Sequence, residues 1–324
     1  MKRFSSMFFA LVLACALSSA AFAAEWPSDT VKLVVAAKAG GGTDLAARIV
    51  AEKMSKLVNE NVIVVNQTEG GGVIAFDTVK EDDAEALQLG FFIPSFFTAY
   101  ISGASEINPL ADVQCASFLG CTDASYICVR ADSPYKTAKD LLDAARANPG
   151  KVVLGLSIGS RTHFTVEEFA RAAGVQFKYV EAGHVADAIP ALLGGHIDVA
   201  YLNGSNTAAY VASGQMRALA VNSEPFVRKP ELKDVPTFAQ IGYPGLKCKT
   251  DFFVVVSKKA PAETLKKINE TLQAVFADDE VKQKFAGIGY AITPLDLEGS
   301  TASYKASFET FDAVGAALGV KVAR

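Results

Sequence analysis

Short apolar runs alternate along the chain with longer segments in which apolar residues recur every three or four positions. The first run, 31–37, is followed after three glycines by a segment in which Leu45, Ile49 and Met54 recur at helical spacing. Such runs predict strands, and the segments between them predict amphipathic helices. Further strands are predicted at 61–66, 87–92, 124–131, 151–159, 176–181, 198–202, 217–221 and 252–256. This alternation is typical of an α/β protein with doubly wound, mostly parallel sheets.

Four predicted strand-to-helix junctions carry small or hydroxylated residues, at 38–44, 68–73, 157–163 and 202–206. In parallel sheets, ligands bind outside the carboxyl ends of the strands, where the next helices begin. The clustering of these residues at equivalent ends therefore predicts a binding site.

The first two junctions contain glycine runs, which are Gly40, Gly41 and Gly42 in the first and Gly70, Gly71 and Gly72 in the second. Glycines at a helix N-terminus let backbone N–H groups approach an anion, and the helix dipole favours negative charge. Thr43 can add a hydroxyl and cap the helix. A tight turn with a cap is the alternative interpretation of either run alone.

The residues around the glycines exclude two nucleotide motifs. A Walker loop requires Gly-Lys-Ser/Thr after the glycines, and Lys38 lies before them. A dinucleotide fingerprint requires a third glycine where this chain has Leu45. A carboxylate is the simplest remaining anion.

Residues 155–159 read G-L-S-I-G, which matches the nucleophile elbow of α/β-hydrolases around Ser157. A serine esterase is therefore one alternative function. The only histidines are His163, His184 and His196, and no His-Gly-Gly-Gly oxyanion segment is present. This context does not favour a catalytic triad.

The same junction is better interpreted as a ligand-binding loop. Ser160 and Thr162 can cap the next helix and donate hydroxyl groups, and Arg161 can bind a carboxylate with its guanidinium group. A solvated surface arginine is the alternative for Arg161. Asn203 follows another strand, where a helix cap is the alternative to ligand contact.

The first 23 residues predict a secretory signal peptide, with Lys2 and Arg3 before an apolar stretch and Ala21-Phe22-Ala23 as the cleavage site. A lipoprotein box at Cys15 is a weaker alternative. Removing two basic residues lowers the formal net charge from −4 to about −6. An acidic chain of this kind is not expected to bind nucleic acid. No later segment is long and apolar enough to predict a membrane span.

Four cysteines follow the signal peptide, and they are Cys115, Cys121, Cys128 and Cys248. Export permits disulfides, and four cysteines allow three pairings. Buried free thiols are the alternative. We expect no zinc site, because no close Cys-x-x-Cys pair is present, and nothing in the sequence implies another metal or a cofactor.

Several segments in this order resemble the extracytoplasmic receptors of tripartite tricarboxylate transporters, also called Bug-type receptors. The similar segments are AKAGGGTDLAARIVAEKM, the glycine run near 70 with VIAFD, VRADSPYKTAKDLL, SIGS, ALLGGHIDV, MRALAVNSE and LKDVPTFAQIGYPG. The resemblance implies a two-domain periplasmic-binding-protein fold of type 2, with a mostly parallel sheet in each domain and a ligand cleft between them. It also implies a periplasmic, monomeric receptor that closes around a small organic acid and delivers it to integral-membrane permease subunits.

The resemblance also implies which residues bind the ligand. The first domain would contribute Gly40, Gly41, Gly42, Thr43, Asp44, Gly70, Gly71 and Gly72, and the second Ser160, Arg161, Thr162 and Asn203. We also expect Lys38 and Ser157, which adjoin these loops, to contact the ligand. Two positions depart from the family pattern. Asn203 stands where many members have aspartate, and Glu69 stands beside the proposed anion site. Because like charges repel, Glu69 either points into solvent or meets a ligand group that donates hydrogen bonds.

We therefore expect a non-enzymatic receptor for a tricarboxylate or dicarboxylate. One domain is predicted to comprise 25–126 plus 250–324, and the other 127–249, with hinges near 126 and 250. A sensor that contacts a signalling protein instead of a permease is a further alternative, since surface contacts carry no readable motif.

Overall fold

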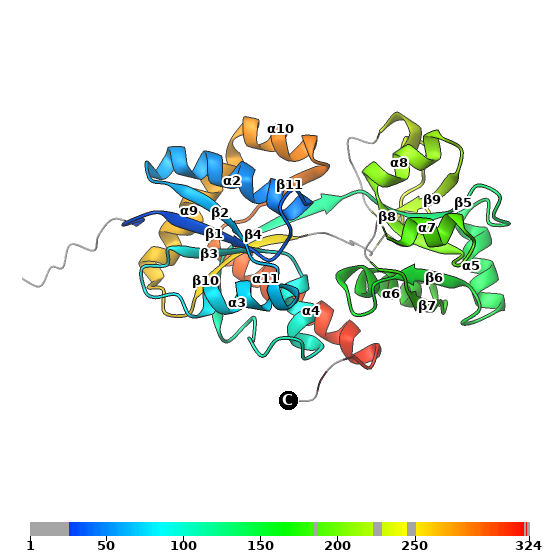
Figure 1. Cartoon of the computed structure of the whole chain (residues 1–324), viewed down its shortest axis with the longest axis horizontal. Coiled ribbons are helices and arrows are strands. Elements are labelled where there is room, and N and C mark those ends of the chain that lie inside the picture. The colour runs from blue at the N-terminus through cyan, green and yellow to red at the C-terminus, as the bar shows by residue number, and fades with distance from the viewer. Residues whose placement is uncertain (1–25, 184–186, 223–228, 245–250, 321, 323–324) are drawn as a thin grey trace, which may run out of the picture.

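The computed structural model describes residues 26–183, 187–222, 229–244, 251–320 and 322, so the predicted signal peptide at 1–23 lies outside the described residues. Two lobes lie side by side, each built on one β-sheet with helices around it (Figure 1). The predicted α/β fold with two domains is therefore confirmed. Among the described residues, no helix is long and apolar enough to cross a membrane.

The first lobe contains a six-stranded sheet in the order β11-β4-β10-β3-β1-β2. Its strands are β1 (Val31–Val35), β2 (Val62–Asn66), β3 (Gln88–Phe92), β4 (Val113–Asp123), β10 (Phe252–Ser257) and β11 (Tyr290–Pro294). Its helices are α2 (Gly42–Val58), η1 (Glu69–Gly72), α3 (Val73–Lys80), α4 (Ser95–Ile101), α9 (Ala262–Ala277), α10 (Asp279–Gly287) and α11 (Leu297–Ala317).

The second lobe contains a five-stranded sheet in the order β7-β6-β8-β5-β9. Its strands are β5 (Ser125–Arg130), β6 (Val153–Leu156), β7 (Lys178–Glu181), β8 (Val199–Asn203) and β9 (Met216–Val221). Its helices are α5 (Ala138–Ala147), α6 (Arg161–Ala173), α7 (Ala188–Leu193), α8 (Gly204–Ala212) and η2 (Pro230–Leu232).

Each sheet contains strands that run against the others, and these are β10 and β11 in the first lobe and β5 in the second. In the first lobe β10 lies between β3 and β4, and in the second β5 lies between β8 and β9. β5 is the first strand after the chain crosses into the second lobe, and β10 is the first strand after it returns to the first lobe. Each of these strands therefore runs away from the lobe that the chain has just left. The expected mostly parallel sheets are thus mixed in pairing, although β1–β4 share one direction and β6–β9 another.

The chain passes from the first sheet to the second between β4 and β5, at Ala124, and it returns between β9 and β10. β5 begins at Ser125, two residues before the predicted start of the second domain. The return crosses residues 245–250, which lie outside the described residues. The division at 126 and 250, and its role as a hinge, stays a prediction.

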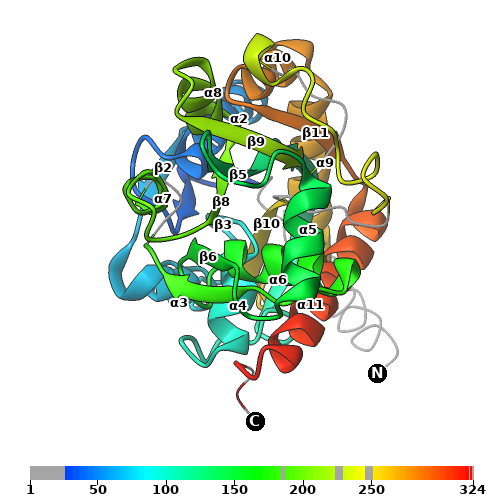
Figure 2. The same ribbon diagram turned by 90° about the vertical axis from the view of Figure 1, so that its right-hand side faces the viewer.

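A third connection between the lobes is made by side chains. Phe164 of α6 is only 1% exposed and belongs to an apolar cluster formed mainly by the first lobe. Its ring centroid lies 5.7 Å from that of Phe311 on α11. A Cβ added at Gly315 would lie 3.3 Å from the Phe164 ring, so α11 approaches α6 closely there. α11 therefore lies against the second lobe (Figures 1 and 2).

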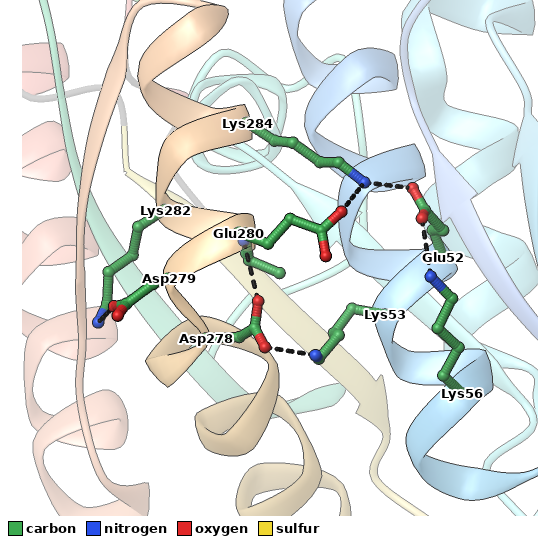
Figure 3. Close-up of polar contacts among 9 residues, drawn as sticks. Glu52, Lys53, Lys56, Asp278, Asp279, Glu280, Lys282 and Lys284 are labelled. Atoms are coloured by element: carbon green, nitrogen blue, oxygen red, sulfur yellow. Dashed lines mark hydrogen bonds and ion pairs between the residues drawn. The ribbon is translucent and has the colours of Figure 1, made fainter.

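Ion pairs join α2 to the α9–α10 corner (Figure 3). Lys284 of α10 contacts Glu52 at 2.8 Å, and Lys53 contacts Asp278. Within α2, Lys56 also contacts Glu52, at 3.0 Å. Lys284, and then Lys56, lowers the pKa of the Glu52 carboxyl from 4.5 to about 2. Solvent screens such pairs, so we assign them a secondary role beside the apolar core.

Two of the four predicted cysteines are described in full. Cys115 and Cys128 are buried free thiols, which agrees with the alternative to a disulfide. Burial raises the pKa of the Cys128 thiol to about 12 and raises that of Cys115 further, so both stay protonated at neutral pH. The side chains of Cys121 and Cys248 lie outside the described part of the chain.

Candidate functional site

The two glycine runs lie at one edge of the first sheet. β1 pairs in parallel with β2 and β3, so the turns after β1 and β2 leave the sheet at the same end. A Cβ added at Gly72 would lie 2.8 Å from Cβ of Ala36, so the second turn packs directly on the first. In Figure 1 the β1–α2 turn lies on the side of its lobe that faces the other lobe. The first lobe therefore presents both glycine turns toward the second.

Backbone conformation explains why glycine occupies these turns. Gly70, Gly71 and Gly72 have φ angles of 60°, 71° and 96°, and Gly40 has φ of 80°. Residues with a Cβ rarely adopt this left-handed region. The N-cap of α2 is Gly41 and the helix begins at Gly42, so the expectation that Thr43 caps it is wrong.

Asp44 holds the first turn in shape. The residue is 1% exposed, and its carboxylate accepts hydrogen bonds from Gly40 N at 2.8 Å, Arg48 Nε at 2.9 Å and Asn66 Nδ2 at 3.0 Å. The bond from Arg48 is the largest cause that lowers the pKa of Asp44 to about 2. Asn66 Nδ2 also donates to Ala37 O at 2.9 Å, so the end of β2 is tied to the turn after β1. Asp44, expected to contact ligand, is thus satisfied within the protein.

The second lobe contains a cavity of about 300 Å³ at the carboxyl ends of its parallel strands. β6 pairs in parallel with β7 and β8, so the loops after these strands meet there. The cavity is lined by Gly155, Leu156, Ser157, Ser160, Thr162, Gly183, Ala188, Tyr201, Asn203 and Asn206. None of these ten residues carries a formal charge.

Two helices begin at this cavity. Ser160 caps α6, and its Oγ accepts a hydrogen bond from His163 N at 3.3 Å. Asn203 caps α8, and its Oδ1 accepts from Asn206 N at 3.0 Å. Both cap residues also line the cavity, so capping and ligand contact are compatible roles. The positive ends of two helix dipoles therefore converge on an uncharged cavity, an arrangement that favours an anion.

The structure brings together four of the predicted site residues, Ser157, Ser160, Thr162 and Asn203, as lining of one cavity. Arg161 begins α6 but is not among the lining residues. The glycine turns, with exposed Lys38 beside them, belong to the other lobe. Glu69 is exposed, in line with the expectation that it can point into solvent.

Among the contributors to the two loop clusters that were not predicted are Asn66, Glu181, Gly183 and Tyr201. Glu181 ends β7, and its two carboxylate oxygens accept from Ile158 N at 2.9 Å and Gly183 N at 3.0 Å. It therefore ties the loop after β6 to the loop after β7. Its position at the end of a predicted strand is the only sequence signal that could have indicated it.

Among the residues that the structure describes, no catalytic triad is assembled around Ser157. Nδ1 of His163 accepts a hydrogen bond from Gly159 N at 3.1 Å, so this nitrogen is not available to take a proton from a serine. His196 is exposed, and His184 lies outside the described residues. Within the described ranges, no group of three or more His, Cys, Asp or Glu side chains could hold a metal ion.

The chain is similar to known proteins in both sequence and fold. Residues 46–291 match the family described as TctC, tripartite tricarboxylate transporter family receptor, a range that begins just after the first glycine turn. The "UPF0065 protein in gbd 5'region" of Cupriavidus necator is 30% identical over 260 residues, which cover 80% of this chain and 78% of that protein. BugT of Bordetella pertussis is 27% identical over 275 residues, covering 82% and 81%.

Solved structures agree with the sequence comparisons. The periplasmic binding protein BugD superimposes with a TM-score of 0.70 at 26% identity, covering 91% of this chain and 99% of that one. A Rhodopseudomonas protein, "R. palustris Rpa4515 with adipate", superimposes with a TM-score of 0.74 at 24% identity, covering 92% and 99%. The second likeness is evidence for the fold alone. With more than half of its residues in the family match, this chain belongs to the receptor family of tripartite tricarboxylate transporters.

Proposed function

We propose that the protein is a periplasmic receptor that closes its two lobes around a small organic carboxylate and delivers it to integral-membrane permease subunits. The observation that carries the proposal is the uncharged cavity of the second lobe, where α6 and α8 begin. The glycine turns lie at the edge of the first lobe that faces it, where α2 begins. We propose that they add backbone N–H groups other than those of Gly40 and Gly41, which are bonded within the turn.

Helix ends and hydroxyl groups are suited to bind a carboxylate without a lysine or arginine in the cavity. Each helix N-terminus acts as about half of a positive charge, so two of them offset about one negative charge. Ser160 Oγ already accepts a hydrogen bond from His163 N, which leaves its O–H free to donate to a ligand oxygen. Thr162 and Ser157 line the same cavity and can donate in the same way.

Closure is the mechanism by which such a receptor retains its ligand. A ligand that contacts both lobes favours the closed arrangement by its difference in affinity for the two states. The contact of Phe164 with Phe311 joins the lobes at the first turn of α6, next to the loop that carries Ser160 and Thr162 into the cavity. Solved proteins of similar fold include one described with adipate and one described with bound malate. Their ligands support a carboxylate with two acid groups as the first candidate.

Hydrolysis of an ester by Ser157 is not supported by the position of His163, whose Nδ1 is occupied by Gly159 N. Export to the periplasm rests on the signal peptide at 1–23, and the permease partner rests on family membership. We propose a monomer as the form that meets the permease.

A thermal-shift screen tests the function. The protein is heated with citrate, malate, adipate, glutamate and nicotinate, and chromogenic esters are assayed alongside. A ligand specific for the folded state adds about 2.7 kcal/mol of stability at a hundredfold excess over its dissociation constant. Ser157→Ala should weaken that stabilisation, whereas Ser303→Ala, a partly buried serine of α11, should not. Ester turnover that disappears in Ser157→Ala would overturn the proposal.

A further inference from the structure

His163 contacts the loop 157–162, which lines the cavity, through two different atoms. The side chain is 5% exposed and lies in the first turn of α6. Its Nδ1 accepts from Gly159 N at 3.1 Å, and its backbone N–H donates to Ser160 Oγ at 3.3 Å. The loop that carries Ser157, Ser160 and Thr162 into the cavity is therefore held by the residue that follows it.

The hydrogen bond also determines the protonation state of the ring. A backbone N–H can only donate, so Nδ1 must be unprotonated, and the proton of the neutral imidazole lies on Nε2. Nε2 is buried and has no hydrogen-bond partner among the described residues. The ring packs edge-on against Tyr179 of β7, with 4.6 Å between ring centroids.

The loop is fixed from two sides. Gly159 has φ of 79°, a left-handed conformation, and its amide is held by His163. The preceding amide, of Ile158, is held by the carboxylate of Glu181. Because both amides are engaged by side chains, the loop keeps its shape before any ligand enters, and its hydroxyl groups remain for the ligand.

We propose that His163 is a positioning residue: its neutral ring holds the 157–162 loop in the ligand-binding shape, and its protonation releases the loop. In the imidazolium ion Nδ1 carries a proton, so two donors face each other and the bond to Gly159 N is lost. This inference rests on the proposed function only for its consequence, a loss of carboxylate affinity in acid.

The surroundings set the pH range of this release. Burial lowers the pKa of His163 below its usual 6.5, and the negative charge of Glu181 opposes this shift. Tyr179, which packs on the ring, donates its hydroxyl to Glu167 Oε2 at 2.8 Å. Because the pKa is lowered, the ring is neutral and the loop is held at pH 7, and the release occurs as the pH falls below 6.5.

The test uses NMR on the ligand-free full chain, so it does not depend on knowing the ligand. Imidazole nitrogen shifts are recorded with labelled histidine from pH 7.5 to 5, together with the protection factor of the Gly159 amide against hydrogen exchange. We expect the proton on Nε2 at pH 7.5, and Gly159 protection that falls with the same midpoint as the His163 titration. A proton on Nδ1 at pH 7.5, or Gly159 protection that ignores this titration, would overturn the inference.

His163→Asn is the matched variant, because Oδ1 of asparagine occupies the place of Nδ1 and accepts without titrating. Gly159 should stay protected across the whole pH range in this variant, and it should be unprotected throughout in His163→Leu. If either variant does not fold, the wild-type titration still decides.

The consequence for binding is measured with the acid that stabilises most in the thermal-shift screen. Between pH 7.5 and a pH below the His163 midpoint measured by NMR, its affinity for the wild type should fall roughly threefold to tenfold more than for His163→Asn, the equivalent of one net hydrogen bond. The variant corrects for titration of the ligand itself. If no acid binds, the proposed function fails while the NMR result still decides the role of His163.

Discussion

Asp44→Asn tests whether the glycine turn of the first lobe is held by a buried carboxylate. In the wild type this carboxylate accepts from Gly40 N, Arg48 Nε and Asn66 Nδ2. In the variant an amide NH2 replaces one oxygen, so at least one of the three donors faces another donor. A rotation of the Asn66 amide cannot repair this, because its Nδ2 also donates to Ala37 O. A buried donor left without a partner costs about 1–3 kcal/mol, and we expect a loss of about 2 kcal/mol in the free energy of unfolding.

The pH dependence of this loss follows from the lowered pKa of Asp44. Its folded-state pKa is about 2 and its ordinary value is 3.8. A lowered carboxyl pKa stabilises the fold fully above pH 3.8, and the contribution is lost as the pH falls through about 2. The difference between wild type and Asp44→Asn should therefore be constant from pH 7 to pH 5 and shrink below about pH 4.

The fluorescence of Trp26 is a suitable probe for this measurement. It is the single tryptophan of the chain, it is 7% exposed in the core of the first lobe, and its Nε1 donates to Ala86 O at 3.1 Å. Denaturant unfolding followed at this residue reports the lobe that contains Asp44. Asp77→Asn, on the exposed face of α3, is the control for the change of charge. If both variants lose less than about 0.5 kcal/mol, as surface substitutions usually do, the turn is not held by Asp44.

Three further predictions concern packing and surface charge. Gly72→Ala should destabilise the first lobe more than Gly289→Ala. Both glycines have φ above 90°, but only at Gly72 would the new Cβ meet a neighbouring turn, at 2.8 Å from Cβ of Ala36. Equal losses in denaturant unfolding would contradict the packing of the two glycine turns. Phe164→Ala should lower the free energy of unfolding by about 3–5 kcal/mol in denaturant unfolding, because the buried ring is lost. It should also separate the lobes and increase the radius of gyration in small-angle scattering. An unchanged radius would contradict the role of Phe164 between the lobes. Glu52→Gln should lower the melting temperature less than Asp44→Asn, and 1 M salt should remove most of its effect; an effect that persists in salt would contradict a screened surface pair.

Local patterns in the sequence were sufficient for most helices and strands. Thr137, for example, is the N-cap of α5 and forms a capping box with Asp140, an arrangement that depends only on residues three positions apart. β4 and β11 were not predicted. β4 contains Cys, Ser, Gly and Thr and lacks an alternating pattern, and it forms because β10 and β11 pair with it on either side. Those partners are more than 125 positions away in the sequence, so no local window could indicate the pairing.

The residues of the candidate site also fall into two groups, those that local sequence predicts and those that depend on contacts with distant segments. Residues whose role is local were predictable, such as the caps Ser160 and Asn203 and the left-handed glycines, because a turn or a helix end constrains its own residues. Side chains that act on a loop from another strand were not, and Asn66 and Glu181 are the examples.

The sequence alone therefore determined the order of the elements, the junctions where a ligand can bind and the resemblance to a receptor family, because these depend on neighbouring residues. Tertiary structure decided which loops meet in one cavity, that Asp44 holds a turn, that β10 and β5 run antiparallel, and that Phe164 joins the lobes. These features depend on contacts between segments that are far apart along the chain, and only the folded arrangement brings such segments within hydrogen-bonding or van der Waals distance.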